Sequence, residues 1–532
     1  MNTSFYNGVS GAKSYQYGMD VIGNNIANVN TVGYKSSDVE FSTIFSQTLS
    51  ESASLPTSNQ IGLGSRVSAT SLNLSQGSLQ NSDNKFDLAI AGDGWFAVNY
   101  NNETFYTRNG NMSLDASEYL TDGNGGYLLG VNANNIVPTV NTDGTTSYQA
   151  TLIDTIPLTQ QTPVDKIFLP QNLSIPAQPT TQVSIKGNLD NTVIKDIVNI
   201  TVDPNQYTLT TTDNNASIEG TISPTQDIID PKPGDTVSIT ITNATGQSKI
   251  VQTTLDENLH WSLQNIDTSN LDPVNNGPIT AEATLATTQE IANQEHFITP
   301  IILPSGEKGL LDMTFTKHIP QSTTGSVWDA EIKLKDGDNV IDTKTGVLTF
   351  NDVGALVSNS IEPLSNQGVE LNINFGTLYD PTIPSSGFDG LTSMNNINTK
   401  LTGEEHNGYI AGELSDYVVG DNGYIYANFS NGKSTAIAKI PIFHFQNDQG
   451  LEKKGSNYFQ NTSNSGQAFF YTDVNGNVIE TSKIRSYMLE SSNVELSTAL
   501  TEMIVIQKAF EANSKSITTS DQMIQQAINM KK

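Results

Sequence analysis

The side chains that most often carry out chemistry in proteins are sparse and scattered in this sequence. Histidine occurs at five isolated positions, with no pair at the spacing of metal ligands: His260, His296, His318, His406 and His444. Cysteine is absent, which excludes disulfides, thiolate metal sites and cysteine nucleophiles. The sequence therefore predicts no catalytic residue, no cofactor and no metal site.

Two short loops contain residue types that bind phosphate or calcium in other proteins. Gly92-Asp93-Gly94 lacks the third glycine and the helix start that a phosphate-binding loop requires. In Asp473-Val474-Asn475-Gly476-Asn477 the glycine stands at the fourth position, whereas a calcium loop has it at the sixth. Both segments are predicted to be turns, and we expect the protein not to be an enzyme.

Apolar residues recur at intervals of three or four along both ends of the chain. The N-terminal stripe consists of Phe5, Val9, Ala12, Tyr15, Met19, Ile22, Ile26 and Val29. The C-terminal stripe consists of Leu496, Leu500, Met503, Phe510, Ile517, Ile524 and Ile528, with Gln507, Ser514 and Asp521 as polar interruptions. No proline precedes Pro56 or follows Pro441, so both ends are free to be helical. The spacing predicts two amphipathic helices that pair as a coiled coil.

These stripes have two interpretations. A terminal amphipathic helix usually covers the core of its own domain, but here both ends carry stripes that are separate from the body of the chain. This favours contacts between subunits, and the candidate interface residues are Phe5, Val9, Met19, Ile22, Ile26, Val29, Leu496, Leu500, Met503, Phe510, Ile517 and Ile524. Four asparagines are either exposed helix and turn residues or polar contacts between subunits: Asn24, Asn25, Asn28 and Asn30.

Composition restricts the partners and the fold class. The chain has 532 residues, of which 15% are charged, and a net charge of −29. Nucleic acid is an unlikely partner for such an acidic chain, since phosphate binding needs a basic face. No apolar run reaches the ~18 residues of a membrane span, so we expect no membrane insertion. The N-terminus lacks the features of a cleaved signal peptide, so any export is expected to leave it intact.

Between the predicted helices the chain is expected to be mainly β, with domains nested inside one another. Short strand-like runs begin near Phe86–Ile90, and runs of the same kind occur again at Tyr424–Phe429. The two segments are therefore predicted to form one composite domain. Gly33 is expected to close the first helix, and Ser492 to cap the second with Glu495. The predicted domains are 1–35 with 490–532 (terminal helices), 36–75 (connector), 76–145 with 400–489 (composite β), 146–179 with 291–399 (outer β) and 180–290 (outermost β).

Long motifs near both ends resemble a known family. Met19-Asp20-Val21-Ile22-Gly23-Asn24-Asn25-Ile26-Ala27-Asn28-Val29-Asn30-Thr31-Val32-Gly33-Tyr34-Lys35 is similar to the N-terminal signature of bacterial flagellar rod and hook proteins. The segments 86–96, 106–110 and 492–523 are similar to later blocks of the same family. The long insertion at 146–400 favours the hook branch over the rod branch.

The resemblance implies a structural function. It implies a subunit exported by the flagellar type III apparatus and polymerised outside the cell into the curved, flexible hook, which transmits torque from rod to filament. The implied partners are other copies of the chain, the rod, the hook cap, the hook–filament junction proteins and the export apparatus. Two alternatives stay open: a distal rod subunit of the same family, or a secreted β-rich adhesin or surface-layer protein.

Overall fold

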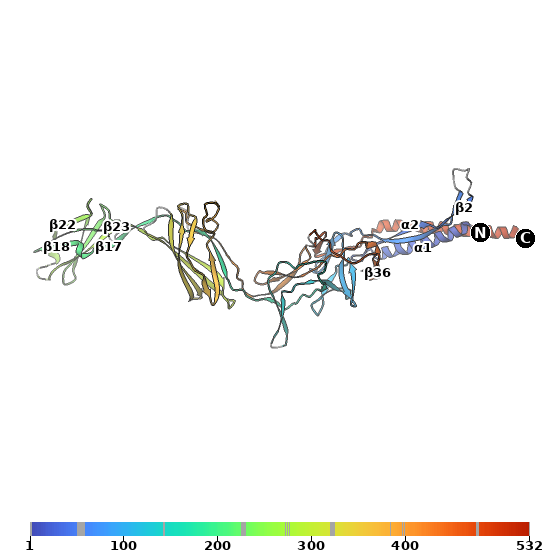
Figure 1. Cartoon of the computed structure of the whole chain (residues 1–532), viewed down its shortest axis with the longest axis horizontal. Helices are drawn as coiled ribbons and strands as arrows, with labels where there is room; N and C mark the ends of the chain where they lie inside the picture. Colours follow the sequence, from blue (N-terminus) through green and yellow to red (C-terminus); the bar gives the residue numbers. More distant parts are fainter. Residues whose placement is uncertain are drawn as a thin grey trace. The chain divides into compact units, whose positions relative to one another are not determined.

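The computed structural model describes residues 3–50, 59–141, 144–224, 230–271, 273, 275, 277–319, 325–383, 385–395, 397, 400–474 and 478–530. The chain divides into two compact units (Figure 1). The first unit comprises Met1–Pro176 and Ala411–Lys532, and the second comprises Ala177–Ile410. Residues 475–477 of the predicted turn at 473–477 lie outside the described residues.

The predicted helices form at both ends of the first unit. Helix α1 spans Thr3–Ala27 and helix α2 spans Leu496–Met530, and the two helices contact each other. The segment between α1 and the β body, which was predicted only as a connector, contains four strands. Strand β1 (Ser37–Thr43) pairs with β4 (Ser65–Leu72), and β2 (Ser46–Ser50) pairs with β3 (Asn59–Gly62), both antiparallel. Polar residues in this segment thus form a ribbon, defined here as β1 and β4.

The β body of the first unit combines two distant parts of the chain. Its large mixed sheet contains β7 (Phe96–Tyr100), β8 (Glu103–Thr107), β9 (Met112–Leu114), β10 (Leu120–Asp122), β11 (Tyr127–Asn132), β12 (Ile136–Val140), β13 (Thr146–Ala150), β14 (Asp165–Lys166), β15 (Leu173–Ile175), β33 (Gly412–Val419), β34 (Tyr424–Phe429), β35 (Ser434–Lys439), β36 (Glu452–Gly455) and β37 (Tyr458–Gln460). Two smaller pairs join β6 (Leu88–Ala91) to β38 (Lys483–Ser486) and β5 (Leu79–Asn81) to β39 (Met488–Glu490). Asn-Gly between two alternating runs predicts a hairpin, and β34 and β35 do pair across Asn431-Gly432.

The second unit contains two hydrophobic cores. Around Trp328 pack β16 (Gln182–Asn188), β29 (Leu364–Asn366), β30 (Val369–Asn374), β31 (Leu391–Thr392), β32 (Lys400–His406), β24 (Gln294–Ile302), β25 (Lys308–Lys317), β26 (Ser326–Asp336), β27 (Asn339–Phe350) and β28 (Leu356–Asn359). Around Trp261 pack β17 (Ile194–Thr201), β20 (Thr236–Thr242), β21 (Ser248–Thr254), β23 (Thr280–Ile291), β18 (Tyr207–Thr212), β19 (Asn215–Thr221) and β22 (His260–Asp267). Short 3₁₀ turns at Pro204–Gln206, Ser269–Leu271 and Asp448–Gly450 complete the elements.

The mainly β fold with paired terminal helices is confirmed, but the structure differs from three predicted domain borders. Residues 146–175 belong to the first unit, because β15 pairs with β33. Strand β16 lies with the Trp328 core, since Val183 pairs with Ile373 and His406. Strand β32 also belongs to the second unit rather than to the composite domain. Alternation of apolar and polar residues indicates that a strand is half-buried, but it does not identify a pairing partner so far away in sequence.

A buried lysine lies where the chain passes from one core of the second unit to the other. Lys317, at the end of β25, is 2% exposed. Its Nζ donates hydrogen bonds to the carbonyls of Asn191 at 2.6 Å and Thr192 at 3.4 Å, between β16 and β17. Burial lowers the pKa of Lys317 to about 8, although the charges of Asp190 and Glu290 oppose the shift.

This pKa shift predicts a pH dependence of stability. Between about pH 8 and 10.5 the unfolded chain holds a proton on Lys317 that the folded chain has released, so stability should rise with pH in this window. Relative to a Lys317→Met variant, the unfolding free energy of the second unit should increase by roughly 2–3 kcal/mol from pH 7.5 to 10.5. Guanidinium unfolding followed by Trp328 fluorescence, with the other two tryptophans replaced by Phe, measures this. Identical pH profiles for the two proteins would contradict the assignment.

Candidate assembly site

The terminal helices pack against each other in opposite directions. Gly8 near the start of α1 faces Ile517 of α2, whereas Gly23 near the end of α1 faces Met503. Both chain termini lie at the same end of the pair (Figure 1). Because α2 has 35 residues and α1 has 25, the last turns of α2 extend beyond the start of α1.

The buried face of α1 consists mostly of small residues. This face, called the seam, is formed by Gly8, Gly11, Ser14, Gly18, Ile22 and Asn25, and its three glycines lie against α2. A Cβ atom on Gly8 would lie 2.9 Å from Cγ1 of Ile517, and one on Gly18 would lie 3.1 Å from Cδ1 of Ile506. Each glycine costs a helix about 1 kcal/mol relative to alanine. Here the missing side chains let the two backbones approach closely.

The predicted apolar stripe of α1 therefore flanks the seam instead of forming it. Of the predicted interface residues in α1 and the turn after it, only Ile22 is buried; the half-buried ones are Phe5, Val9, Met19, Ile26 and Val29. On α2, Met503, Phe510 and Ile517 are half-buried. By contrast, Leu496, Leu500 and Ile524 are 45%, 47% and 40% exposed. The predicted set thus divides into residues of the helix pair and residues that the subunit leaves uncovered.

The ribbon packs along α1 on a second side. Ser14 Oγ donates to the carbonyl of Ser65 at 3.1 Å, and Asn25 Nδ2 donates to the carbonyl of Ser37 at 2.9 Å. Phe41 from β1 also approaches Gly18 and contacts the ring of Tyr15 at 5.5 Å between centroids. Helix α1 is consequently held by both α2 and the ribbon.

Most of the asparagine cluster is bonded inside the subunit. Asn24 Nδ2 donates to the hydroxyl of Tyr34 at 3.2 Å, and that hydroxyl donates to Asn25 Oδ1 at 3.2 Å. Asn28 Nδ2 donates to the carbonyl of Asn24 at 2.9 Å. The Asn30 side chain is exposed. Asn24, Asn25 and Asn28 thus make hydrogen bonds within the subunit, and their contact with other subunits stays a prediction.

A buried ion group fastens the helix pair to the β body. Glu490 Oε1 lies 2.7 Å from Lys35 Nζ, and Glu490 Oε2 lies 3.2 Å from Arg108 Nη1, with all three side chains at most 4% exposed. The backbone N–H of Gly77 also donates to Glu490 Oε1 at 2.9 Å. Burial lowers the pKa of Lys35, and the Glu490 carboxylate opposes that shift. The group joins segments from four places in the sequence.

Both predicted helix boundaries are wrong near this ion group. Helix α2 begins at Leu496, not directly after Ser492, because the side chain of Asn493 is engaged elsewhere. Asn493 Nδ2 donates to the carbonyl of Asn73 at 2.9 Å, and its Oδ1 accepts from the N–H of Ser36 at 2.8 Å. Helix α1 ends at Ala27, before Gly33. Gly33 does have a positive φ of 66°. It lies against the backbone of Arg108, whose carbonyl carbon would be only 2.5 Å from a Cβ atom at this position, so no larger residue fits.

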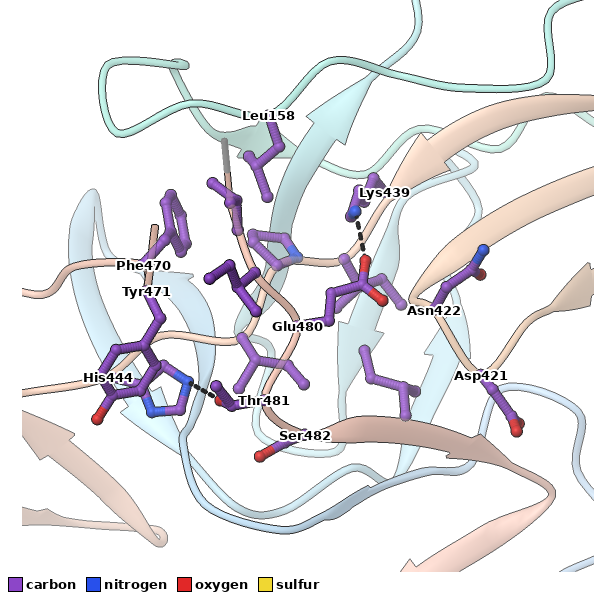
Figure 2. A pocket seen from close by; sticks show the side chains of 16 residues that line it. Leu158, Asp421, Asn422, Lys439, His444, Phe470, Tyr471, Glu480, Thr481 and Ser482 are labelled. Carbon is purple, nitrogen blue, oxygen red and sulfur yellow. Dashed lines mark hydrogen bonds and ion pairs between the residues drawn. The ribbon is translucent and has the colours of Figure 1, made fainter. Parts of the chain in front are cut away.

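A small cavity in the β body does not have the dimensions of a substrate site. It encloses about 30 Å³, room for about one water molecule, between Leu158, Lys439, His444 and Glu480 (Figure 2). Lys439 Nζ pairs with Glu480 Oε1 at 2.6 Å, and His444 Nε2 lies 3.5 Å from Thr481 Oγ1. Burial lowers the pKa of His444. These groups already satisfy one another.

No group of three or more His, Asp or Glu residues in the described parts is placed to hold a metal ion. Within the same parts, no helix is long and apolar enough to cross a membrane.

Comparison with known proteins identifies the family. Residues 5–35 match the family model "Flagella basal body rod protein", residues 89–244 match "Flagellar hook protein FlgE/F/G D1 domain", and residues 485–530 match "Flagellar basal body rod FlgEFG protein C-terminal". These matches include both helices, the ion group and part of the β body. The chain belongs to the flagellar rod and hook family of axial structural proteins.

Full-length similarity places the chain in the hook branch. It is 28% identical to the flagellar hook protein FlgE of Borreliella burgdorferi over 100% of both chains, and 26% identical to FlgE of Salmonella typhimurium over 99% and 100%. The rod protein FlgG of Bacillus subtilis is 42% identical, but it aligns with only 26% of this chain and 55% of its own. The protein is a structural subunit of the bacterial flagellar hook.

The seam predicts opposite effects for two glycine substitutions in one helix. Gly23→Ala should stabilise α1 by up to about 1 kcal/mol, because its new Cβ would lie 3.8 Å from Met503. Gly8→Ala makes the same change in helix propensity but meets Ile517 at 2.9 Å, so it should lose that gain and separate the helices. Thermal unfolding followed by helical circular dichroism compares the two. Equal stabilisation by both would show that the seam is not tightly packed.

The ion group predicts a large cost for one neutral substitution. Glu490→Gln keeps the side-chain shape but leaves two buried cations without their carboxylate, so the first unit should lose about 3–5 kcal/mol. Asp416→Asn is the matched control, because Asp416 pairs with Lys85 at a half-exposed site and should cost less than about 1 kcal/mol. Denaturant unfolding measures both. A loss below 1 kcal/mol for Glu490→Gln would refute an anchoring function for this group.

Proposed function

We propose that this hook subunit polymerises through its terminal helix pair, which forms the inner wall of the hook tube. The observation that supports this most strongly is apolar surface on a helix that is already paired. Leu496, Leu500 and Ile504 are 45%, 47% and 58% exposed on one side of α2, and we call them the proximal stripe. Burial of such a side chain contributes about 1.5–3 kcal/mol, so contact with a neighbouring copy would be favourable.

The end of α2 offers a second apolar surface. Ile524, Ile528 and Met530 lie where α2 extends past α1 and are 40%, 57% and 83% exposed. Ile524 and Ile528 continue the spacing of Met503, Phe510 and Ile517 along the helix. A neighbouring α1 could cover this extension, with half-buried Phe5, Val9, Met19, Ile26 and Val29 completing the contact.

The charge distribution is compatible with close packing of the ends. Two lysines stand against one aspartate within residues 1–35, although the whole chain carries −29. Nearly neutral helices can approach one another in a tube without strong repulsion. We further propose that the β body forms a middle shell and that the second unit contributes the outer surface, where its acidic residues remain solvated.

The remaining proposals follow from family membership. The subunit would pass through the flagellar type III export apparatus with its N-terminus intact and add outside the cell beneath the hook cap. The polymer would contact rod and hook–filament junction proteins and act as a flexible joint that transmits torque. A distal rod subunit would also polymerise through terminal helices of this kind. The rod relative, however, matches only 26% of this chain.

One exposed substitution tests the helical interface. Leu500→Asp should leave the monomer folded, because Leu500 is 47% exposed, yet it should abolish tube formation by placing a carboxylate in an apolar contact. Thr519→Asp introduces the same charge at an exposed position of α2 outside the proximal stripe and should permit assembly. Electron microscopy of hooks on cells, with secreted subunit measured in the medium, provides the comparison. Normal hooks formed by Leu500→Asp, or equal failure of both variants, would contradict the proposal.

A further inference from the structure

Two adjoining grooves lie where α1 meets the β body. One has a volume of about 320 Å³ and the other about 400 Å³, and they share Asn28, Ser456 and Asn457. Together they are called the trough. The tip of the β36–β37 hairpin borders it, with Ser456 and Asn457 in left-handed conformations at φ 51° and 60°. The volume of the trough exceeds that of several water molecules, so a side chain and its backbone fit inside.

The trough is rich in amide groups and is lined by two lysines, of which Lys35 is paired with Glu490. Its walls include side-chain amides that can donate hydrogen bonds, from Asn24, Asn28, Asn109, Asn111, Asn124 and Asn457. Lys453, from β36, also lines the trough. Its Nζ donates to the Ser37 hydroxyl at 2.8 Å and to the carbonyl of Lys35 at 3.1 Å. The rings of Tyr34 and Phe459 lie 5.3 Å and 6.0 Å from Nζ, so the ammonium is fixed in place.

This ammonium has no carboxylate partner among the described residues. Glu452, next to it in sequence, pairs instead with Lys454 at 2.9 Å. Glu490 is occupied by Lys35 and Arg108. Lys453 as a whole is exposed, so its ammonium can be reached by a carboxylate that enters the trough.

We propose that the trough is a docking site for an aspartate or glutamate of a second copy of this chain, with Lys453 as its ion-pair partner. The inference rests on the proposed polymerisation and adds a specific polar contact to it. Asn24, Asn28 and Asn457 line the same groove, but their Nδ2 atoms already donate within the subunit, so the ammonium supplies the main contact.

Two properties of the chain favour a second copy as the occupant. The chain has 55 acidic and 26 basic residues, so every copy presents an excess of carboxylates to its neighbours. Contacts in a helical polymer are heterologous, which means that a basic site on one copy meets a different surface on the next. The trough lies beside the end of α1, at the border between the proposed inner wall and the β body.

Carbodiimide coupling in mixed polymers tests the contact directly. Polymers are assembled from equal amounts of ¹⁵N-labelled and unlabelled subunits, coupled, digested and examined by mass spectrometry. The expected product is an isopeptide bond between Lys453 and an Asp or Glu in mixed-isotope peptides, absent from monomers. The inference is overturned if other lysines couple between copies while Lys453 does not. Coupling of Lys453 only to a carboxylate of its own copy, or only to a different protein, counts as such a result.

A pair of neighbouring variants supplies an independent measurement. Lys453→Gln polymers should dissociate about tenfold faster or more than wild-type polymers, whereas Lys454→Gln polymers should dissociate at the wild-type rate. Circular dichroism of each monomer checks that the fold is retained. Wild-type dissociation by Lys453→Gln would overturn the inference while leaving the proposed function intact. Failure of wild-type subunits to polymerise at all would contradict both.

Discussion

Glu490 is buried between two cations, and this arrangement sets where both ends of the chain emerge from the β body. A carboxylate without partners in such a place would cost several kcal/mol. Arginine stays charged in proteins, and Glu490 is the carboxylate that lies against Arg108. Lys35 follows the end of α1, and Glu490 precedes the start of α2. The pairing therefore brings together the two points from which the helices leave, and it requires segments that are 455 residues apart in sequence.

Once the helices start from a common point, the small residues of the seam decide how closely they pack. Gly8 and Gly18 allow Ile517 and Ile506 to approach the α1 backbone. The bulky residues beside the seam are consequently left half-covered, and the proximal stripe of α2 is left exposed. A helix pair built this way is stable enough to exist in one subunit and still has apolar surface for its neighbours. That combination suits a polymer whose subunits join through their helices.

Polar contacts complete the region where the helices meet the body. The asparagines after the middle of α1 are largely used within the subunit, as Asn25 shows by bonding the ribbon at Ser37. Lys35 and Arg108 share the carboxylate of Glu490. The ammonium of Lys453 instead donates to a hydroxyl and a carbonyl, neither of which carries a negative charge. In the proposed polymer, apolar contacts along the helices would supply most of the association energy, and an ion pair of Lys453 at their base would fix the register between copies.

The sequence by itself determined the elements and the family of this protein. Periodicity predicted both helices, strand-like runs predicted β segments such as Tyr424–Phe429, and Asn431-Gly432 predicted a hairpin, because each signal depends on neighbouring residues. Long terminal motifs identified a flagellar axial subunit. The seam, the ion group and the pairing of β16 were decided only by the tertiary structure. Glycines carry no apolar signal, Glu490 looks like a surface residue in isolation, and Val183 meets Ile373 only after the intervening chain has folded. Local patterns report which face of an element is buried, whereas the identity of the partner depends on the packing of residues hundreds of positions away.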